Sequence, residues 1–278
     1  MILCIDAYNF LHRARSGFTL GEHAIIFNFM RNFRAIVDQF KPTRVYFTLE
    51  GVPASRFERL PEYKANRIVD PTDLSKVAEL ENFHAQKALI IETLNNIFPI
   101  SVVRHPGLEA DDLIYNLIKR STTAVPWVVV SNDSDFTQLL NEFDHVQVYN
   151  PMKKTFVEKT EYEYVTWKAL RGDPSDNIPG IPGIGDKKAE KLARDEKLFK
   201  EFLDSDEKIE RQWCNNFDLI HFIEMSDHDM KEMTCSEPIR NWDVLKSLFT
   251  TWGFNSLLKD KTWEKYVATF DPLWGNIK

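Results

Sequence analysis

The chain has 278 residues and a net charge of −7, with 43% hydrophobic and 13% aromatic side chains, which is enough apolar material for a large core and excludes a disordered chain. No apolar run approaches the roughly 18 residues that span a bilayer, and the N-terminus lacks the basic start and cleavage site of a signal peptide. Cys4, Cys214 and Cys235 are too scattered for a zinc site or a disulfide framework, so a cytoplasmic, reduced protein is expected.

The first 170 residues alternate between strand and helix patterns. Apolar runs typical of buried strands occur at 2–6, 44–50, 100–103 and 127–133. Apolar residues at helical spacing occur at 24–40, 73–98 and 109–120. This alternation predicts an α/β fold with a mostly parallel sheet flanked by helices.

Two local signals follow the fourth predicted strand. The segments 146–150 and 155–159 read as short strands, which we expect to pair with each other. Thr160 and Glu163 have the spacing of a capping box, which predicts a helix from there to about residue 170.

Beyond residue 200 the pattern is helical, with apolar stripes at 217–223, 241–249 and 263–270. We expect these helices to pack onto the main domain. The aromatic residues Trp242, Trp252 and Phe254 either join that core or dock a partner, and the pattern leaves both readings open. The predicted division is an α/β domain over residues 1–170 and a second, helical region over residues 171–278.

Acidic residues gather where the predicted strands end. In open α/β sheets, sites are built in the crevice beyond the carboxyl ends of the strands. Acids three apart on a helix, or two apart on an extended segment, also face one way. The acids of this set are Asp6, Glu50, Glu109, Asp111, Asp112, Asp133, Asp135, Asp173 and Asp176.

Each of these acids has an ordinary alternative role as a helix cap, a partner of the helix dipole or a turn residue. As a set they would repel one another by about 4 kcal/mol per pair at 4 Å and an effective dielectric near 20, so cations are needed to neutralise them. Oxygen ligands without His or Cys favour a hard ion, Mg²⁺ or Mn²⁺. Two such ions clamp the attacking and leaving oxygens of a phosphodiester.

This clustering changes the meaning of the net charge. Without the nine clustered acids, 33 of the 42 acidic residues remain against 35 basic residues, a balance of +2. The acidity is therefore concentrated in the predicted metal site, and the rest of the chain is no obstacle to binding a polyanion.

The stretch "GDPSDNIPGIPGIGDKKAEKL" (172–192) holds four of the ten glycines of the chain and leads directly into a helical run. Gly183 and Gly185 let a backbone approach a phosphate at a helix N-terminus, and Lys187, Lys188 and Lys191 supply positive charge. Such a contact reads phosphate and not bases. Carbonyl groups at 180–185 could also hold a monovalent cation such as K⁺. The alternative is a simple loop followed by a capped helix.

Together these motifs resemble the flap endonuclease/5′–3′ exonuclease family, which includes the 5′ nuclease domain of bacterial DNA polymerase I. The glycine-rich stretch is similar to the helix–three-turn–helix of that family. The other family blocks follow in order as "CIDAYNFLHRA", "LPEYKANR", "GLEADDLI" and "VSNDSDFTQLL". The chain length and "LPEYKANR" most resemble the stand-alone bacteriophage-type members.

The resemblance implies a PIN-like nuclease domain with a helical arch at about 55–98, and two divalent ions. It assigns Asp6, Glu50, Glu109, Asp111 and Asp112 to one metal subsite, and Asp133, Asp135, Asp173 and Asp176 to the second. It also implies that Lys64 and Arg67, at the base of the arch, contact the scissile phosphate. Tyr63 could stack on an unpaired base, and the alternative is an exposed arch tyrosine without that role.

Two positions depart from the family pattern. The acid of the second strand, usually Asp before Gly, is Glu50, so its direct contact with a metal is open. The glycine that commonly follows the first Asp is Ala7.

The resulting hypothesis is a structure-specific 5′ nuclease that acts as a flap endonuclease and 5′–3′ exonuclease and removes RNA primers during replication. Mg²⁺ is the expected cofactor, with Mn²⁺ able to substitute. The expected partners are DNA with a 5′ flap, nick or RNA primer, and a single-stranded DNA-binding protein or other replication proteins. We expect a monomer in a cytoplasm, that of the bacterial host for a phage protein. The alternatives are a PIN-like ribonuclease and a DNA-binding replication accessory without catalysis.

Overall fold

Seven strands form one sheet at the centre of the computed structural model, which describes residues 1–17, 21–121 and 125–275. Their order is β6-β5-β4-β1-β2-β3-β7, with the five central strands parallel and the two edge strands antiparallel to their neighbours. The strands are β1 (Ile2–Asp6), β2 (Arg44–Leu49), β3 (Ser101–Arg104), β4 (Trp127–Val130), β5 (Val146–Asn150), β6 (Thr155–Phe156) and β7 (Thr234–Cys235).

This topology confirms the mostly parallel sheet and the pairing of β5 with β6. The strand β7 was not predicted, because two residues that pair only with β3 leave no periodic pattern in the sequence.

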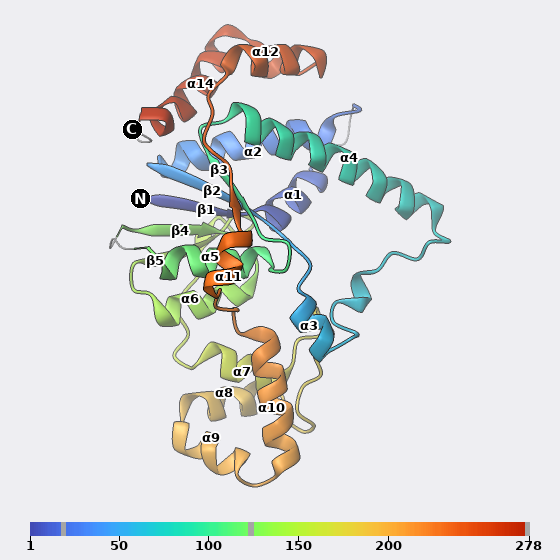
Figure 1. Ribbon diagram of the computed structural model, residues 1–278, viewed down its shortest axis with the longest axis vertical. Coiled ribbons are helices and arrows are strands. Elements are labelled where there is room, and N and C mark those ends of the chain that lie inside the picture. The colour runs from blue at the N-terminus through green and yellow to red at the C-terminus, as the bar shows by residue number, and fades with distance from the viewer. Residues whose placement is uncertain (18–20, 122–124, 276–278) are drawn as a thin grey trace.

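The helices of the described ranges lie on both faces of the sheet and at its ends (Figure 1). They are α1 (Ala7–Arg15), α2 (Ala24–Phe40), α3 (Ala54–Arg59), α4 (Leu74–Ile97), α5 (Ala110–Lys119), α6 (Thr137–Glu142), α7 (Tyr164–Arg171), α8 (Asp186–Arg194), α9 (Glu196–Leu203), α10 (Glu207–Ile220), α11 (Asp227–Glu232), α12 (Trp242–Thr251), α13 (Asn255–Leu258) and α14 (Asp260–Gly275). None of these helices is long and apolar enough to cross a membrane.

Alternate strand residues build two separate cores, because successive side chains of a strand point to opposite faces. Leu3 and Ile5 of β1 pack in the largest apolar cluster, against α1, α2 and α4. Cys4, which lies between them, packs on the other face with residues of α5 and α6 such as Ile114 and Leu139. Burial on both faces explains why the central strands read as continuous apolar runs.

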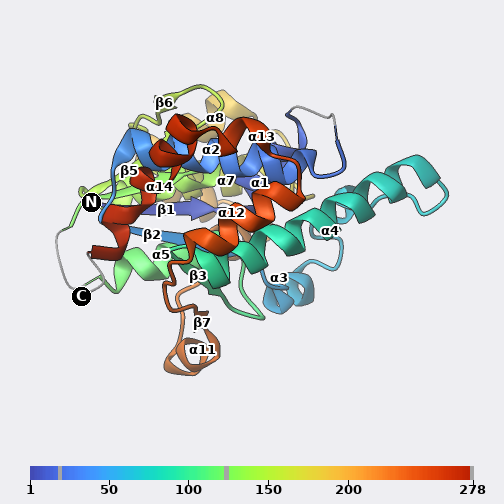
Figure 2. The ribbon, with the colours of Figure 1, turned by 90° about the horizontal axis from the view of Figure 1, so that it is seen from above.

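The predicted long helices are confirmed nearly to the residue, including α2 at 24–40 and α4 at 74–97. The first half of α4 extends beyond the rest of the molecule (Figure 2). One helix start was wrong: α7 begins at Tyr164, and Glu163 itself is the N-cap, accepting from the amide of Thr166 at 2.7 Å. The hydroxyl of Thr160 instead donates to the carbonyl of Tyr162 at 2.7 Å, so no capping box forms.

From α7 onward, the helices α7–α10 and the helices α12–α14 form two groups at opposite ends of the molecule (Figure 1). The group α7–α10 forms small clusters of its own around Ile178 and Ile184. The group α12–α14 packs into the main core against α2 and α4, as expected. Phe254 is buried there, and Trp242 and Trp252 are partly buried against the same cluster, which decides these three aromatic residues in favour of the core.

Candidate active site

The parallel strands bring their acidic ends to one edge of the sheet. Asp6 is the last residue of β1 and also the N-cap of α1, where its Oδ1 accepts from the amide of Asn9 at 3.2 Å. Its Oδ2 accepts from the hydroxyl of Ser131, just after β4, at 2.8 Å. Glu50 follows β2, and its neighbours in space include Asp6 and Glu109. The expectation that strand-end acids lie together is met for these groups.

A glycine allows the end of β2 to approach the loop that precedes α5. The Gly51 amide donates to the carbonyl of Leu108 at 2.7 Å. A Cβ atom on Gly51 would lie 2.1 Å from the carbonyl oxygen of His105, well inside any tolerated contact. Only glycine therefore fits after Glu50, and this close approach places that acid beside the start of α5.

Glu109 accepts hydrogen bonds from three different side chains. Its Oε1 forms an ion pair with Lys64, and its Oε2 accepts from Arg56 at 2.5 Å and from the hydroxyl of Tyr63 at 2.9 Å. Burial alone would raise the pKa of Glu109, but Lys64 and Arg56 hold that pKa below its usual value. Carboxylate oxygens of Glu109, Asp111 and Asp112 lie within 4.8 Å of one another, a spacing that fits a shared cation.

Arg56 was missed by the sequence reasoning, although it is central to this geometry. Its guanidinium is 3% exposed and binds both oxygens of Asp112 at 2.8 Å while also contacting Glu109. Its Nε donates to the carbonyl of Leu219 at 3.1 Å. The fork of Arg56 thus fixes both acids, and nothing in its local sequence separates it from the neighbouring exposed Arg59.

Tyr63 corrects the expectation of an exposed arch residue. Its side chain is 3% exposed, and its hydroxyl lies 2.9 Å from Glu109 Oε2 and 3.2 Å from Asp176 Oδ2. A buried tyrosine needs a partner for its hydroxyl, and here two acids supply it. Tyr63 therefore links the two predicted metal subsites and cannot stack on a base in this conformation.

The second group of acids lines a cavity of about 350 Å³ that includes Asp133, Asp135, Asp173 and Asp176. Asp173 Oδ2 accepts from Lys168 at 2.7 Å, and Lys168 also forms an ion pair with Asp135. The hydroxyl of Tyr164 donates to Asp135 at 3.1 Å. Lys168 was missed too, and the only signal was its position on the helix immediately before the "GDPSD" motif.

Lys64 and Arg67 both form ion pairs with carboxylates. Lys64, held with a positive φ of 55°, pairs with Glu109 and lies 3.8 Å from Asp176, while Arg67 pairs with Asp176. Burial would lower the pKa of Lys64, but the acids Glu109 and Asp176 raise it to about 12, so the amine is protonated at neutral pH. Lys64 and Arg67 therefore lie beside the acids, and their contact with a phosphate stays a prediction.

Glu50, Asp111 and Asp133 form no ion pair with a described side chain, and the pKa of each is raised. Burial and then the charges of Asp6 and Glu109 raise the pKa of Glu50 to about 7, against the opposing effect of Lys64. Asp133 lines the cavity of about 350 Å³, where solvent reaches it. Partial desolvation and the charge of Asp135 nevertheless raise the pKa of Asp133 to about 7. Burial and Asp112 raise the pKa of Asp111. The nine acids outnumber the four cations Arg56, Lys64, Arg67 and Lys168, which leaves the site short of positive charge.

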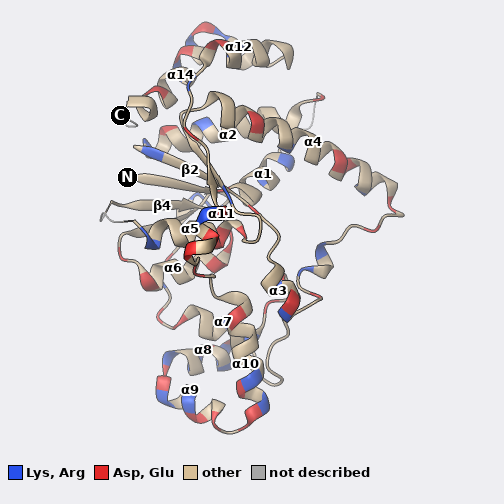
Figure 3. Ribbon diagram, in the orientation of Figure 1, with Lys and Arg blue, Asp and Glu red and all other residues tan. Residues whose placement is uncertain are grey.

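The glycine-rich stretch forms the turn before α8. Gly183 has a φ of 77°, which favours glycine, and Gly185 is the N-cap of α8, with open space beside both. Ile184 between them is 7% exposed and packs with Leu170 and Leu192. The lysines of α8, Lys187, Lys188 and Lys191, are exposed. Figure 3 shows positive and negative residues mixed over α8–α10.

Two profiles of one protein family match residues 1–224 of the chain. The chain matches the profile of the 5′–3′ exonuclease N-terminal resolvase-like domain over residues 1–169, and that of the 5′–3′ exonuclease C-terminal SAM fold over residues 159–224. DNA polymerase I of Mycobacterium bovis is 39% identical over 150 residues, which are 49% of this chain and 15% of the polymerase. A 5′–3′ exonuclease of Mycobacterium tuberculosis is 30% identical over 187 residues, 59% of this chain and 58% of the relative.

Two solved structures share the fold. The T5 D15 protein co-crystallised with metal ions has a TM-score of 0.65 at 20% identity, covering 79% of this chain and 88% of its own. The catalytic core of Rad2 in complex with DNA substrate has a TM-score of 0.58 at 16% identity, covering 97% and 92%. With the strand-end acids in place and a family profile matched over residues 1–169, the chain belongs to the 5′–3′ exonuclease family of nucleases.

Proposed function

We propose that the protein is a Mg²⁺-dependent, structure-specific 5′ nuclease that cleaves phosphodiester bonds near 5′ ends in flaps, nicks and RNA primers. The observation that carries this proposal is the set of nine acids at one sheet edge with too few cations to neutralise them. A site of this charge made only of carboxylate oxygens fits hard divalent ions, and Mn²⁺ can replace Mg²⁺ there.

Glu50, Asp111 and Asp133 are the best candidates to bind metal directly, because none forms an ion pair with a described side chain and the raised pKa of each shows that its ionised form lacks a partner. We assign Asp6, Glu50, Glu109 and Asp111 to the first subsite and Asp133, Asp135, Asp173 and Asp176 to the second. Asp112 belongs to the first group, but both its oxygens accept from Arg56, so we propose that it acts mainly by positioning Glu109 through that arginine.

The bound ions would supply Lewis acidity to the phosphodiester and to the attacking water. Lys64 and Arg67 now neutralise Glu109 and Asp176, and cations at those acids would release both side chains toward a phosphate. Because the amine of Lys64 stays protonated at neutral pH, its role is electrostatic stabilisation of the charge that develops on the phosphate. The hydroxyl of Tyr63 holds Glu109 and Asp176 in their relative positions.

Substrate binding is assigned to two further regions. The turn at Gly183 and Gly185 with the lysines of α8 would grip the duplex backbone, and the segment 55–98 would form an arch for a single strand. We also propose that the chain divides near residue 170 into an α/β domain and a helical region. A further proposal is that carbonyl groups at 180–185 bind K⁺. The carbonyl of Gly180 already accepts from Gln212 Nε2 at 3.0 Å, so other carbonyls would have to bind that K⁺.

Removal of two lysines tests the grip on the duplex. Lys187→Ala/Lys188→Ala is expected to weaken binding of a 5′-flap duplex and to reduce the slope of log K against log salt by about two, one unit for each lost phosphate contact. Fluorescence anisotropy over a salt series measures this slope. The control, Lys197→Ala/Lys200→Ala, removes two exposed charges from the adjacent α9 and should leave the slope unchanged. Equal effects of both pairs would contradict a specific contact at α8.

The raised pKa values predict how stability depends on pH. Glu50 and Asp133 ionise near pH 7 in the fold but near 4 in the unfolded chain, so the unfolded state binds fewer protons between these values. The free energy of unfolding of the metal-free protein should therefore fall as pH rises from about 4 to 7 and then level off.

Mg²⁺ reverses this trend, because it binds the ionised carboxylates. Its apparent Kd should tighten by up to tenfold per pH unit for each proton it displaces, roughly from pH 5.5 to 7. Thermal unfolding with and without saturating Mg²⁺ measures the effect, which Glu50→Gln/Asp133→Asn should flatten. A stabilisation by Mg²⁺ that is the same at every pH would contradict the assignment of these two acids.

Cleavage assays test the proposed function directly. With Mg²⁺ the protein should cut a 5′-flap DNA duplex near the junction and leave a single-stranded RNA of matched sequence nearly intact. A preference for the single-stranded RNA would identify a PIN-like ribonuclease instead. Binding of the flap without cleavage in either Mg²⁺ or Mn²⁺ would identify a DNA-binding accessory.

A further inference from the structure

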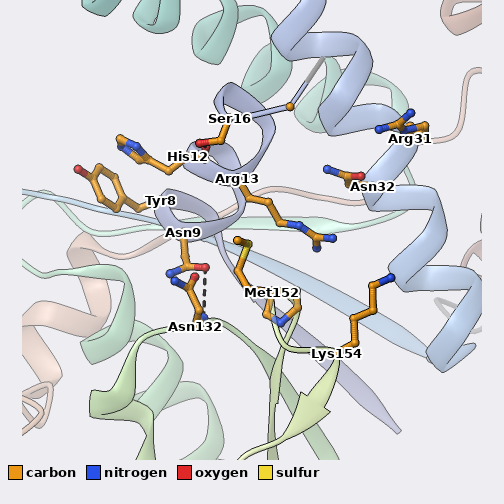
Figure 4. A pocket seen from close by; sticks show the side chains of 12 residues that line it. Tyr8, Asn9, His12, Arg13, Ser16, Arg31, Asn32, Asn132, Met152 and Lys154 are labelled. Carbon is orange, nitrogen blue, oxygen red and sulfur yellow. Dashed lines mark hydrogen bonds between the residues drawn. The ribbon is translucent and has the colours of Figure 1, made fainter. Parts of the chain in front are cut away.

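A second cavity lies beside the acidic site, between α1, α2 and the turn after β5. Its volume is about 520 Å³ (Figure 4). Arg13 of α1, Arg31 of α2 and Lys154 of the turn contribute positive charge from three separate segments. The cavity has no acidic side chain among its lining residues, which sets it apart from the neighbouring site.

The cations of this cavity form no ion pair with any carboxylate in the described part of the chain. No carboxylate of the described residues lies within 4.0 Å of the Arg13, Arg31 or Lys154 charges, whereas the cations of the acidic site all form ion pairs. Partial burial, together with the nearby Arg31, lowers the pKa of Arg13. Like charges that converge in a concave site attract an anion and would otherwise repel one another.

The backbone holds Lys154 in an unusual conformation. Its φ is 59°, in a backbone region that residues other than glycine rarely adopt. The side chain of Asn150 stabilises this turn by accepting from the amides of Met152 and Lys153, each at 2.9 Å. The turn thereby directs Lys154 toward the same space as Arg31 (Figure 4).

Two asparagines connect this cavity to the acids. The amide nitrogen of Asn132 donates to Oδ1 of Asn9 at 3.2 Å, and both residues line the cavity. Asn132 directly precedes Asp133, and the amide of Asn9 donates to Asp6. A polyanion that occupies the cavity would therefore continue into the acidic site without crossing another element.

We propose that this cavity binds a phosphate group of the nucleic-acid backbone close to the scissile bond, at a contact separate from the turn and lysines of α8. The choice of a nucleic-acid phosphate as the ligand rests on the proposed nuclease function. The geometry of the cavity does not depend on that function. Three convergent cations, amide side chains and the hydroxyl of Ser16 suit phosphate oxygens, and the contact would be blind to base sequence. A free nucleotide or inorganic phosphate has the same chemistry and is distinguished by experiment.

The test uses the full chain and the variant Arg31→Ala/Lys154→Ala, whose two side chains are exposed and outside the apolar core. Binding of a 5′-flap duplex is measured by anisotropy in EDTA, where no cleavage occurs, over a series of salt concentrations. We expect about tenfold weaker binding and a salt slope lower by about two. In Mg²⁺ the loss should appear mainly in KM.

The control is Lys261→Ala/Lys265→Ala, which removes the same charge from the exposed face of α14. If the pocket variant and the control bind DNA equally well, the proposal is wrong. Nucleoside monophosphate or inorganic phosphate, titrated against thermal unfolding, provides the second arm. A shift that the pocket variant abolishes, without any change in duplex binding, would assign the pocket to a free phosphate compound and overturn the DNA contact.

Failure of this inference differs from failure of the proposed function. A protein that cuts no substrate in Mg²⁺ but loses duplex binding in the pocket variant would refute the nuclease and retain the pocket. A protein that cuts flaps equally well with and without these two cations would retain the nuclease and refute the pocket.

Discussion

Asp133→Asn is expected to reduce Mg²⁺-dependent cleavage of a 5′-flap duplex by a factor of about 1,000 or more in kcat. The substitution keeps the shape of the side chain but removes a negative charge from an acid whose pKa is raised to about 7. Loss of a metal ligand forfeits several kcal/mol of transition-state stabilisation, and about 1.4 kcal/mol corresponds to a factor of ten. Single-turnover cleavage of a labelled flap measures the rate.

The same variant should bind the flap at least as well as wild type in EDTA, because one charge that repels phosphate is gone. The matched control is Asp144→Asn, an exposed acid of the neighbouring loop, which should cleave at the wild-type rate. Full Mg²⁺-dependent activity in Asp133→Asn would remove this acid from the active site. A loss of DNA binding equal to the loss of rate would mean that it acts on the substrate and not on a metal.

Arg56→Ala is expected to lower the free energy of unfolding by about 3–5 kcal/mol. The substitution leaves Glu109 and Asp112 buried without their guanidinium partner, and an unpaired buried charge costs that much. It also removes the hydrogen bond to the carbonyl of Leu219, which ties α3 to α10. Urea denaturation followed by circular dichroism measures the change.

Arg59 provides the control on the same helix, because its ion pair with Asp218 at 2.9 Å is exposed. Arg59→Ala should cost no more than about 1 kcal/mol. Arg56→Lys keeps the charge without the two-pronged geometry, so it should be intermediate and show whether charge or shape matters more. If Arg56→Ala is as stable as Arg59→Ala, the guanidinium does not hold the two acids as described.

Local patterns were sufficient for the long helices and the central strands of this fold. The helix at 24–40 and the central strands carry apolar residues at a period that one element alone imposes, so the pattern survives without knowledge of neighbours. The placement of acids after these strands was also visible, because every parallel strand ends at the same edge of the sheet. The start of α7 was predicted wrongly, because both Thr160 and Glu163 are able to cap a helix and only Glu163 accepts from an amide of its first turn.

Residue types and short-range spacing were enough to predict the α/β class, the family and the acids at the sheet edge. Tertiary structure alone decided that Tyr63 is buried, that Arg56 grips Asp112, and that Lys168 lies between Asp135 and Asp173. Arg56 and Asp112 are 56 positions apart in the sequence, and Lys168 and Asp135 are 33 apart. Lys168 and Asp173 are only 5 apart, but their contact also depends on the direction of the side chains. No local sequence pattern identifies the partner of a charged residue, because the Coulomb energy of a pair depends on the distance between the two groups in the folded chain.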